Sequence, residues 1–375
     1  MEGRPERQKP IFYILEEESF IPADHPLRKV KKLADGELRR MRKAFKEAYS
    51  RIGRPSVPPE QLIKASLLQA LYSIPSERQL CEQIGYNILF RWFLDLPLDA
   101  EVWNPTTFTK NRKRFEEHGL MRKFFEGSVA RAIQASAASE DHFSVDGTLI
   151  QSWASMKSVR PKDEKDGGDD SNGKGGDSNR WVDWHGEKRT NKTHESKTDP
   201  EARLARKGKG RESILAHSLH VLMENRNGIL MDIEVEAATG TAERECAERM
   251  LRRFRKRHWG KPKTLGADKG YDAGDFLHGL EHDLEVTPHV AIRKGNITGK
   301  TKEAEARRRA RRRQRNKGYQ TSQRCRRKAE EIFGWFKTVG GLRKTRFIGR
   351  WKTQICAYAA GAAYNLLRLS RLSVA

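Results

Sequence analysis

The chain is organised around the stretch Phe-Ser-Val-Asp-Gly-Thr at residues 143–148. Its phenylalanine and valine favour a β-strand, and the glycine after the acid allows the chain to turn sharply. A carboxylate at the end of a buried strand is costly unless it accepts hydrogen bonds or binds a metal ion, so Asp146 requires partners. The sequence therefore predicts a site built around Asp146, with further acids supplied from downstream.

The residues after 210 predict strands and helices in alternation. Residues 231–237 alternate between apolar and acidic side chains, as in a half-exposed strand, and the mostly apolar residues 215–223 form its partner across an Asn-Arg-Asn-Gly turn. A helix from about Thr241, a short strand at 264–268, and a further helix and strand between 276 and 292 follow. Mixed strands with covering helices indicate an α/β layer domain.

The remaining acids of the predicted site come from two later segments. The strand at 264–268 also ends on an acid beside a glycine, so we expect Asp146 and Asp268 to meet at one edge of the core. A third acid should come from a helix, and residues 324–337 offer Glu330 and Glu331. Apolar residues of that helix could hold one of these two acids against the sheet: Ala329, Ile332, Phe333 and Phe336.

The composition indicates a polyanionic partner. Among 375 residues, 74 Lys and Arg stand against 50 Asp and Glu, for a formal net charge of +24, and nucleic acid is the usual partner of so basic a chain. No apolar run is long enough to span a bilayer, and the first residues do not resemble a secretory signal. The cysteines are far apart, which fits a reducing cytosol and argues against a structural zinc site: Cys81, Cys246, Cys325 and Cys356.

Residues 1–139 are expected to form a helical N-terminal domain. Within it, residues 104–115 combine a capping asparagine, a proline near the first turn and a basic face that contains Lys110, Arg112 and Arg114. One interpretation is the DNA-recognition helix of a helix-turn-helix. The other is a helical bundle with a solvated basic face, and the residues alone leave both open because the motif is weakly specific.

Two polar stretches interrupt the second domain, which is expected to span 140–375. Residues 151–212 read as a long inserted polar loop, since their centre is low in complexity and lacks apolar anchors. Residues 296–320 read as a basic linker whose arginines include Arg308 and Arg312. This arginine-rich stretch could be a solvated linker. Its position before the acid-bearing helix favours contact with a DNA backbone, because adjacent cations release many counterions on binding.

Three blocks of the sequence carry a family resemblance. They are Val-Asp-Gly-Thr at 145–148, Gly-Ala-Asp-Lys-Gly-Tyr-Asp at 266–272, and the helix with Arg326, Glu330 and Lys337. In this order they resemble the three blocks of bacterial DDE transposases, and most closely the group typified by insertion sequence 5. The resemblance implies a helical DNA-binding domain followed by a ribonuclease H-like catalytic domain.

The resemblance extends over nearly the whole chain and selects one acid of the helix. In the Tyr, Arg, Glu, Lys signature of the family, the arginine lies four residues before the glutamate and the lysine seven after it, which selects Glu330 over Glu331. The position expected to be tyrosine is Gln323 here, a departure that concerns a DNA contact and not the acids. Residues 22–27 and 53–93 resemble the N-terminal domain of the same group.

The resemblance implies that Asp146, Asp268 and Glu330 are the catalytic acids and the ligands of Mg²⁺ or Mn²⁺, with two ions expected. Three carboxylates in one site raise each other's pKa, and divalent cations resolve that conflict. Two such ions roughly 3.5 to 4 Å apart can activate a water or a DNA 3′-hydroxyl and stabilise the leaving oxygen. Asp272 is an alternative ligand, although its position suits the cap of the next helix better.

The implied DNA contacts lie around the acids. Arg326 and Lys337, on the helix that holds Glu330, are expected near the scissile phosphate or the transposon-end backbone. Lys269, directly after the second aspartate, is a further expected contact.

The implied function is that of a DNA transposase that binds the terminal inverted repeats of an insertion sequence and carries out metal-dependent cleavage and strand transfer. Its partners would be double-stranded DNA, at the repeats and the target site, and a second copy of the chain in a synaptic complex in the bacterial cytoplasm, at the nucleoid. One rival is a non-catalytic DNA-binding protein or inactive copy, which needs no ordered acids. Another is a ribonuclease H-like nuclease, which would nick generic DNA without joining it.

Overall fold

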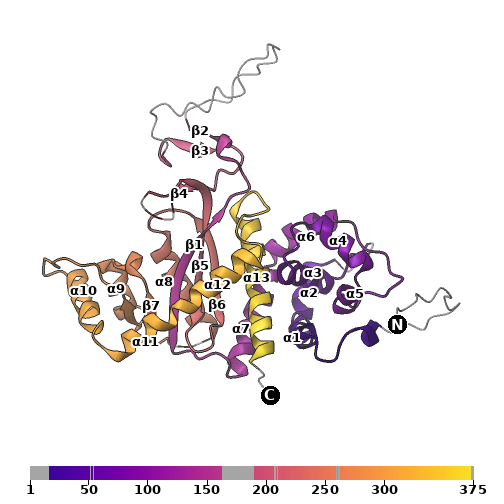
Figure 1. The fold of residues 1–375 in the computed structure, drawn as a ribbon, viewed down its shortest axis with the longest axis horizontal. Helices are drawn as coiled ribbons and strands as arrows, with labels where there is room; N and C mark the ends of the chain where they lie inside the picture. The colour runs from indigo at the N-terminus through magenta and orange to yellow at the C-terminus, as the bar shows by residue number, and fades with distance from the viewer. Residues whose placement is uncertain are drawn as a thin grey trace, which may run out of the picture.

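The computed structural model describes residues 17–372 except 51, 54, 163–189, 207, 209, 259 and 261. The first part of the chain is helical, as the sequence predicts (Figure 1). Its elements are η1 (Glu17–Phe20), α1 (Pro26–Arg40), α2 (Arg42–Ala48), α3 (Pro59–Leu71), α4 (Glu77–Tyr86), α5 (Ile88–Leu94), α6 (Thr106–Glu117) and α7 (Leu120–Gln134).

Short polar residues begin several of these helices. The Ser76 side chain accepts a hydrogen bond from the backbone of Gln79 at the start of α4, and Asn87 does the same for Phe90 at the start of α5. Such caps satisfy amide groups that have no partner inside the helix.

A mixed sheet follows the helices. Its main strands are β1 (His142–Gln151), β5 (Ile214–Glu224), β6 (Leu230–Ala237), β7 (Thr264–Ala267) and β8 (Thr287–Val290). Strand β5 lies between β1 and β6 and is antiparallel to both, whereas β7 and β8 continue the sheet beyond β1 in parallel. The order β6-β5-β1-β7-β8 is that of a ribonuclease H-like domain, which confirms the fold expected from the resemblance.

The insertion between β1 and β5 is more ordered than the predicted polar loop at 151–212. Its described part holds η2 (Met156–Ser158), the paired strands β2 (Val159–Pro161) and β3 (His194–Ser196), and β4 (Arg203–Ala205), which pairs with β5. A small apolar cluster lies beneath it, made of Ala154, Val159, Ala202 and Leu215. The low-complexity centre at 163–189 lies outside the described residues.

Buried polar residues fasten the base of this insertion to the sheet. The Asp199 carboxylate accepts hydrogen bonds from the Ser152 hydroxyl at 2.7 Å and from the His217 ring at 3.1 Å, and all three side chains are fully buried. Residues far apart in the sequence are thereby joined, since Ser152 follows β1, Asp199 follows β3 and His217 lies in β5.

Helices cover both faces of the sheet. They are α8 (Ala242–His258), η3 (Lys269–Tyr271), α9 (Gly274–His282), α10 (Lys302–Arg313), α11 (Lys317–Cys325), α12 (Arg327–Thr338) and α13 (Arg350–Arg371). Helix α8 packs on β5, β6 and β1, while α11 and α12 pack against β1. None of the described helices is long and apolar enough to cross a membrane.

The predicted basic linker at 296–320 is largely helical, because its arginines find acidic partners on neighbouring elements. Arg307 forms an ion pair with Asp272, while Arg309 and Arg313 both pair with Glu281 on α9. Helix α10 therefore packs on α9 as part of the domain (Figure 1).

The C-terminal helix α13 joins the two halves of the chain. It contacts β6 on one side and α1, α3, α6 and α7 on the other, and it stands between the sheet and the N-terminal helices (Figure 1). One hydrophobic core extends from Ile21 through the sheet to Leu369. The predicted boundary after residue 139 thus falls inside a continuous core.

Candidate active site

Asp146 lies in the middle of the sheet, on β1. Its Oδ1 accepts a hydrogen bond from the amide of Gly147 at 2.8 Å, and its Oδ2 accepts one from Nη1 of Arg326 at 2.9 Å. The side chain is 17% exposed, so solvent can reach one edge of the carboxylate.

Strand pairing brings Asp268 beside Asp146. Ser144 of β1 and Gly266 of β7 are partners in a parallel pair, and each aspartate follows two residues after its member of that pair. Asp268 is the N-cap of η3, where its Oδ1 accepts a hydrogen bond from the amide of Gly270 at 2.7 Å. The two aspartates therefore lie on neighbouring strands, Asp268 just beyond the end of β7 and Asp146 within β1, which does not end at this acid as predicted but continues to Gln151.

Glu330 reaches this edge from the first turn of α12. The apolar residues expected to pack this helix are buried, and Glu330 itself is exposed. Its negative charge acts on Asp146, whereas the charge of Glu331 acts on Tyr364. The two neighbouring glutamates thus face different surroundings, and Glu330 is the one beside the aspartates.

Burial and like charges both act on the carboxylate of Asp146, and burial is the larger cause. Burial raises the pKa of Asp146 above its ordinary value, and the nearby charges of Asp268 and Glu330 raise it further. The hydrogen bond from the Gly147 amide and the charge of Arg326 oppose this shift and do not cancel it. The site therefore holds more negative charge than its protein partners neutralise.

A fourth acid, Glu243, lies in the same cluster and was missed in the sequence. It sits in the first turn of α8, is half-buried, and forms no hydrogen bond or ion pair within the described part of the chain. Burial raises the pKa of Glu243, and the charges of Asp268 and Asp146 add to the shift. The sequence gives no distinguishing signal, because acids are common in the first turn of any helix.

The donor set suits a hard divalent cation. Carboxylate oxygens are the protein ligands that Mg²⁺ and Mn²⁺ prefer, and these acids lack enough cationic partners. Among the described residues, no three His, Cys, Asp or Glu side chains lie close enough to hold a metal ion in their present positions. Arg326 engages Asp146 instead, so its guanidinium must release the carboxylate before the acids can converge on a metal ion.

Comparison with protein families identifies the chain. Residues 174–366, just over half of its 375 residues, match the family described as "Transposase DDE domain". The chain belongs to the DDE transposase family. Residues 15–114 match a second description, "Transposase domain (DUF772)". The protein is accordingly a DNA transposase, a polynucleotidyl transferase whose family uses divalent metal ions on DNA.

Two solved transposase structures are similar to this chain in outline. One is the piggyBac transposase synaptic complex with hairpin DNA, with 9% identity and a TM-score of 0.39 over 94% of this chain and 74% of that one. The other is the Mos1 transposase paired-end complex with left transposon end, with 14% identity and a TM-score of 0.21 over 78% of this chain and 81% of that one. Structural similarities this weak support no conclusion about this transposase. No curated protein matches the chain significantly.

The side chains predicted to contact DNA near the acids of the transposase are partly engaged with the protein. Arg326 pairs with Asp146, and the Lys337 ammonium donates a hydrogen bond to the Thr148 hydroxyl. Lys269 is exposed. Gln323, at the position where the family signature has tyrosine, donates from its side-chain amide to the carbonyl oxygens of Ala267 and His289.

The expected role of Asp272 as a helix cap is wrong. The N-cap residue of α9 is Ala273, and no side chain caps that helix. Asp272 instead accepts two hydrogen bonds from Arg307 and one from the amide of Arg293. Burial raises the pKa of Asp272, but these hydrogen bonds lower it overall. This acid is therefore fully neutralised within the fold.

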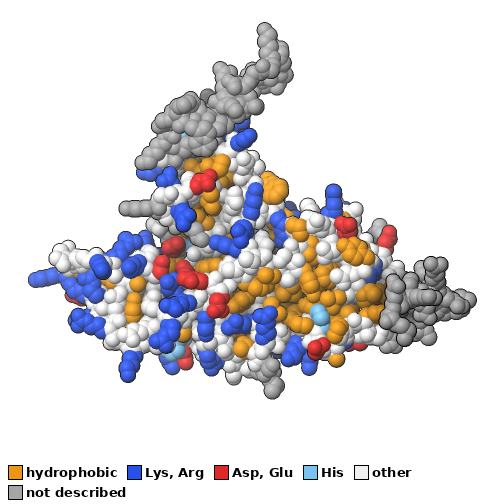
Figure 2. Space-filling view, viewed as in Figure 1, with side chains coloured by type: hydrophobic (Ala, Val, Ile, Leu, Met, Phe, Trp, Pro, Cys, Tyr) orange, Lys and Arg blue, Asp and Glu red, His pale blue; other side chains and the backbone are white. Residues whose placement is uncertain are grey.

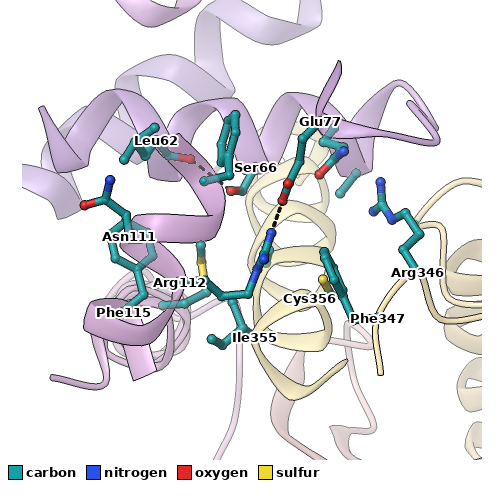
Figure 3. Close-up of a pocket in the computed structure, with 16 residues that line it drawn as sticks. Leu62, Ser66, Glu77, Asn111, Arg112, Phe115, Arg346, Phe347, Ile355 and Cys356 are labelled. Atoms are coloured by element: carbon teal, nitrogen blue, oxygen red, sulfur yellow. Dashed lines mark hydrogen bonds and ion pairs between the residues drawn. The ribbon is translucent and has the colours of Figure 1, made fainter. Parts of the chain in front are cut away.

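The basic face predicted on α6 divides into exposed and inward-facing cations. Lys110 is exposed. Arg112 forms an ion pair with Glu77 and lies 4.2 Å from the ring centre of Phe347, in a pocket between the N-terminal helices and α13 (Figure 3). Arg114 lies 4.4 Å from the ring centre of Tyr49 and donates to Asn111. Arg112 and Arg114 therefore hold the fold together.

The arginines of α10 divide in a similar way. Arg308 donates hydrogen bonds to the carbonyl oxygens of Ile297 and Gly299, so it tethers the preceding loop. The side chain of Arg312 forms no hydrogen bond or ion pair with the described residues and lines a surface hollow together with Arg315. On the face in Figure 2, acidic side chains gather where Figure 1 labels β1 and α8, with Lys and Arg on either side.

Proposed function

We propose that this transposase cleaves and joins DNA with Asp146, Asp268 and Glu330 as its catalytic acids. The observation that carries the proposal is the position of the two aspartates, each two residues beyond the paired residues Ser144 and Gly266. The charge of Glu330 acts on Asp146 from α12, so three acids from distant segments share one edge of the sheet. Exposure of Glu330 leaves that edge open to DNA.

The three acids are proposed to hold two Mg²⁺ or Mn²⁺ ions. When bound, such ions activate a water or a 3′-hydroxyl and stabilise the leaving oxygen of an in-line phosphoryl transfer. The protein contributes the carboxylates and fixes their positions: the Gly147 amide orients Asp146, and the Gly270 amide orients Asp268. These backbone contacts direct one oxygen of each aspartate, while the second oxygen of Asp146 accepts a hydrogen bond from Arg326.

Cations around the acids are proposed to hold the DNA backbone. Arg326 balances part of the charge of Asp146, and once released it can bind a phosphate at the same edge. Lys337, Lys269 and the exposed cations Lys110 and Arg312 are proposed to contact phosphates farther from the reaction.

The biological setting follows from the resemblance of the sequence blocks. We propose that the enzyme belongs to the insertion sequence 5 group, binds the terminal inverted repeats of its element through the N-terminal helices, and acts as a homodimer that pairs two transposon ends. Its place would be the bacterial cytoplasm, at the nucleoid.

Strand cleavage and joining on a labelled duplex that carries the flanking inverted repeat of the element, with Mg²⁺, tests this function. Asp146→Ala, Asp268→Ala and Glu330→Ala are expected to abolish both steps, a loss of roughly a thousandfold or more, while DNA binding persists. Glu331→Ala is the matched control, since this acid is the exposed neighbour of Glu330 on the same helix, and it should retain activity.

Each other outcome contradicts a part of the proposal. DNA binding without cleavage by the unaltered protein would indicate a non-catalytic copy. Nicking of generic DNA without joining would indicate a nuclease. Activity that survives all three substitutions would place the reaction elsewhere in the chain.

A further inference from the structure

The carboxylate of Glu243 lies between the two aspartate motifs. A Cβ atom added to Gly147, directly after Asp146, would lie 3.5 Å from Oε1 of Glu243. A Cβ atom added to Gly270, two residues after Asp268, would lie 3.0 Å from Oε2 of Glu243 and 3.0 Å from Oδ1 of Asp268. At Gly147 the nearest atom is Nδ1 of His220, at 3.0 Å, so it is the missing side chain of Gly270 that makes room for Glu243 beside Asp268.

A buried hydroxyl faces the same cluster. Tyr271 is 1% exposed, and its hydroxyl has no hydrogen-bond partner among the described residues. The charged groups that act on it are led by Glu243, followed by Asp146 and Asp268. An unpaired buried hydroxyl is costly, so its presence beside these three acids indicates that the cluster takes up a further group.

The ordinary explanation for an acid in a first helical turn does not fit Glu243. An acid that merely complements the helix dipole lies in solvent, as Glu245 of the same turn does. Glu243 is half-buried, its carboxylate lies beside that of Asp268 above Gly270, and its side chain forms no hydrogen bond in the described part of the chain. Repulsion of this kind persists in a fold when a cation compensates it.

We propose that Glu243 is a fourth carboxylate ligand of the divalent metal ion, acting together with Asp146 and Asp268. This inference rests on the proposed function, in which the two aspartates hold the metal. It adds a ligand from α8 to the three acids of the family signature, and it gives a reason for the glycine at position 270. The metal thereby links helix α8 to the central strands.

Titration of the full-length protein with Mn²⁺ in the absence of DNA, followed by calorimetry, tests this proposal without any catalytic readout. Glu243→Gln should weaken Mn²⁺ binding by at least about tenfold, the range seen when groups that support a metal are lost. Glu245→Gln, the exposed acid of the same turn, should bind Mn²⁺ like the unaltered protein. Asp146→Asn reports on the proposed function itself and should also bind weakly.

Thermal unfolding without metal separates a ligand from a structural residue. Because Glu243→Gln removes a repelling charge, it should raise the melting temperature of the metal-free protein while lowering its affinity for Mn²⁺. A second variant, Gly270→Ala, crowds Glu243 and should weaken Mn²⁺ binding as well. Its control is Gly334→Ala on α12, where a Cβ atom meets nothing within 4 Å.

The outcomes distinguish this inference from the proposed function. Unchanged Mn²⁺ affinity in Glu243→Gln, with weak binding in Asp146→Asn, would overturn the role of Glu243 and leave the three catalytic acids in place. Unchanged affinity in Asp146→Asn would overturn both. A fall in melting temperature with unchanged affinity in Glu243→Gln would assign this residue a purely structural role.

Discussion

Two clusters of carboxylates in this transposase differ in how their charge is balanced. In the N-terminal half, the buried Lys64 ammonium lies 2.6 Å from Asp35 and also pairs with Asp95, which pairs with Lys31 at 2.5 Å. At the edge of the sheet, Asp146, Asp268, Glu330 and Glu243 lie close together, Arg326 pairs with Asp146 alone, and the charge of Arg244 acts on Glu243. We call these the balanced cluster and the unbalanced cluster.

The pKa shifts of the two clusters run in opposite directions. Burial raises the pKa of Asp95, but the hydrogen bonds from Lys31 and Lys64 lower it overall. Burial and neighbouring acids raise the pKa of Asp146 instead. Burial is the largest cause that raises the pKa of both aspartates, and at Asp95 the hydrogen bonds from two lysines outweigh it. A balanced cluster stabilises a fold, whereas an unbalanced one is typical of a site that binds a further charge.

The largest effect outside the catalytic acids is expected from breaking the balanced cluster. Lys64→Met leaves Asp35 and Asp95 without their shared cation, which should cost about 2 to 3 kcal/mol of unfolding free energy, since Asp95 remains 63% exposed and partly solvated. Urea unfolding measures this loss. Lys113→Met is the control, because its ammonium is 79% exposed and should change stability by less than about 0.5 kcal/mol.

The opposite pKa shifts predict opposite pH dependence in the metal-free protein. Because the folded-state pKa of Asp146 is raised above its ordinary 3.8, its favourable contribution is present below that value and is lost as pH rises through the raised pKa. The contribution of Asp95, whose pKa is lowered, is present above 3.8 and is lost as pH falls. At pH 7, Asp146→Asn should therefore raise the melting temperature and Asp95→Asn should lower it.

Melting curves of the two aspartate variants between pH 4 and pH 7 in a chelating buffer check these signs. The difference for Asp146→Asn should shrink toward pH 4, where the raised pKa lets this carboxylate protonate, whereas the difference for Asp95→Asn should persist to pH 4, because its contribution is lost only below 3.8. A melting temperature of Asp146→Asn below that of the unaltered protein at pH 7 would show that Arg326 fully balances this acid.

The smallest effects concern the basic face of α6. Lys110→Ala should weaken binding to any DNA sequence by less than about tenfold and reduce the slope of affinity against salt by about 1, as for a single phosphate contact. Arg112→Ala should leave the salt slope unchanged and destabilise the fold, since Arg112 pairs with Glu77 and stacks on Phe347. A reduced salt slope in Arg112→Ala, with an unchanged slope in Lys110→Ala, would instead indicate that Arg112 contacts DNA.

Much of the fold was predictable because its signals are local. Alternating residues predicted the hairpin of β5 and β6, and β7 ends just before Asp268 as predicted. The strand end predicted at Asp146 is wrong, because β1 continues through Gly147 to Gln151 in its pairing with β5. The apolar side of α12 and the spacing to Arg326 and Lys337 pointed to Glu330 rather than Glu331, and the surroundings of the two glutamates agree with that choice.

The remaining features depend on partners that are distant in the sequence. Arg112 was predicted on a basic surface, but Phe347 and α13 cover it in the structure. The arginines of α10 form a helix because α9 and Asp272 supply acids. Glu243 joins the unbalanced cluster only once α8 packs on β1. Charge alone cannot reveal whether a residue finds such a partner.

Replacement of Mg²⁺ by Fe²⁺, followed by ascorbate and peroxide, tests most directly whether the unbalanced cluster is the metal site. Hydroxyl radicals formed at bound iron cut the nearest backbone, and mass spectrometry of the fragments locates the cuts. Cuts next to Asp146, Asp268 and Glu330 that disappear with excess Mg²⁺ are the predicted result. Cuts near Asp35 and Asp95, or a pattern unrelated to either cluster, would contradict the account.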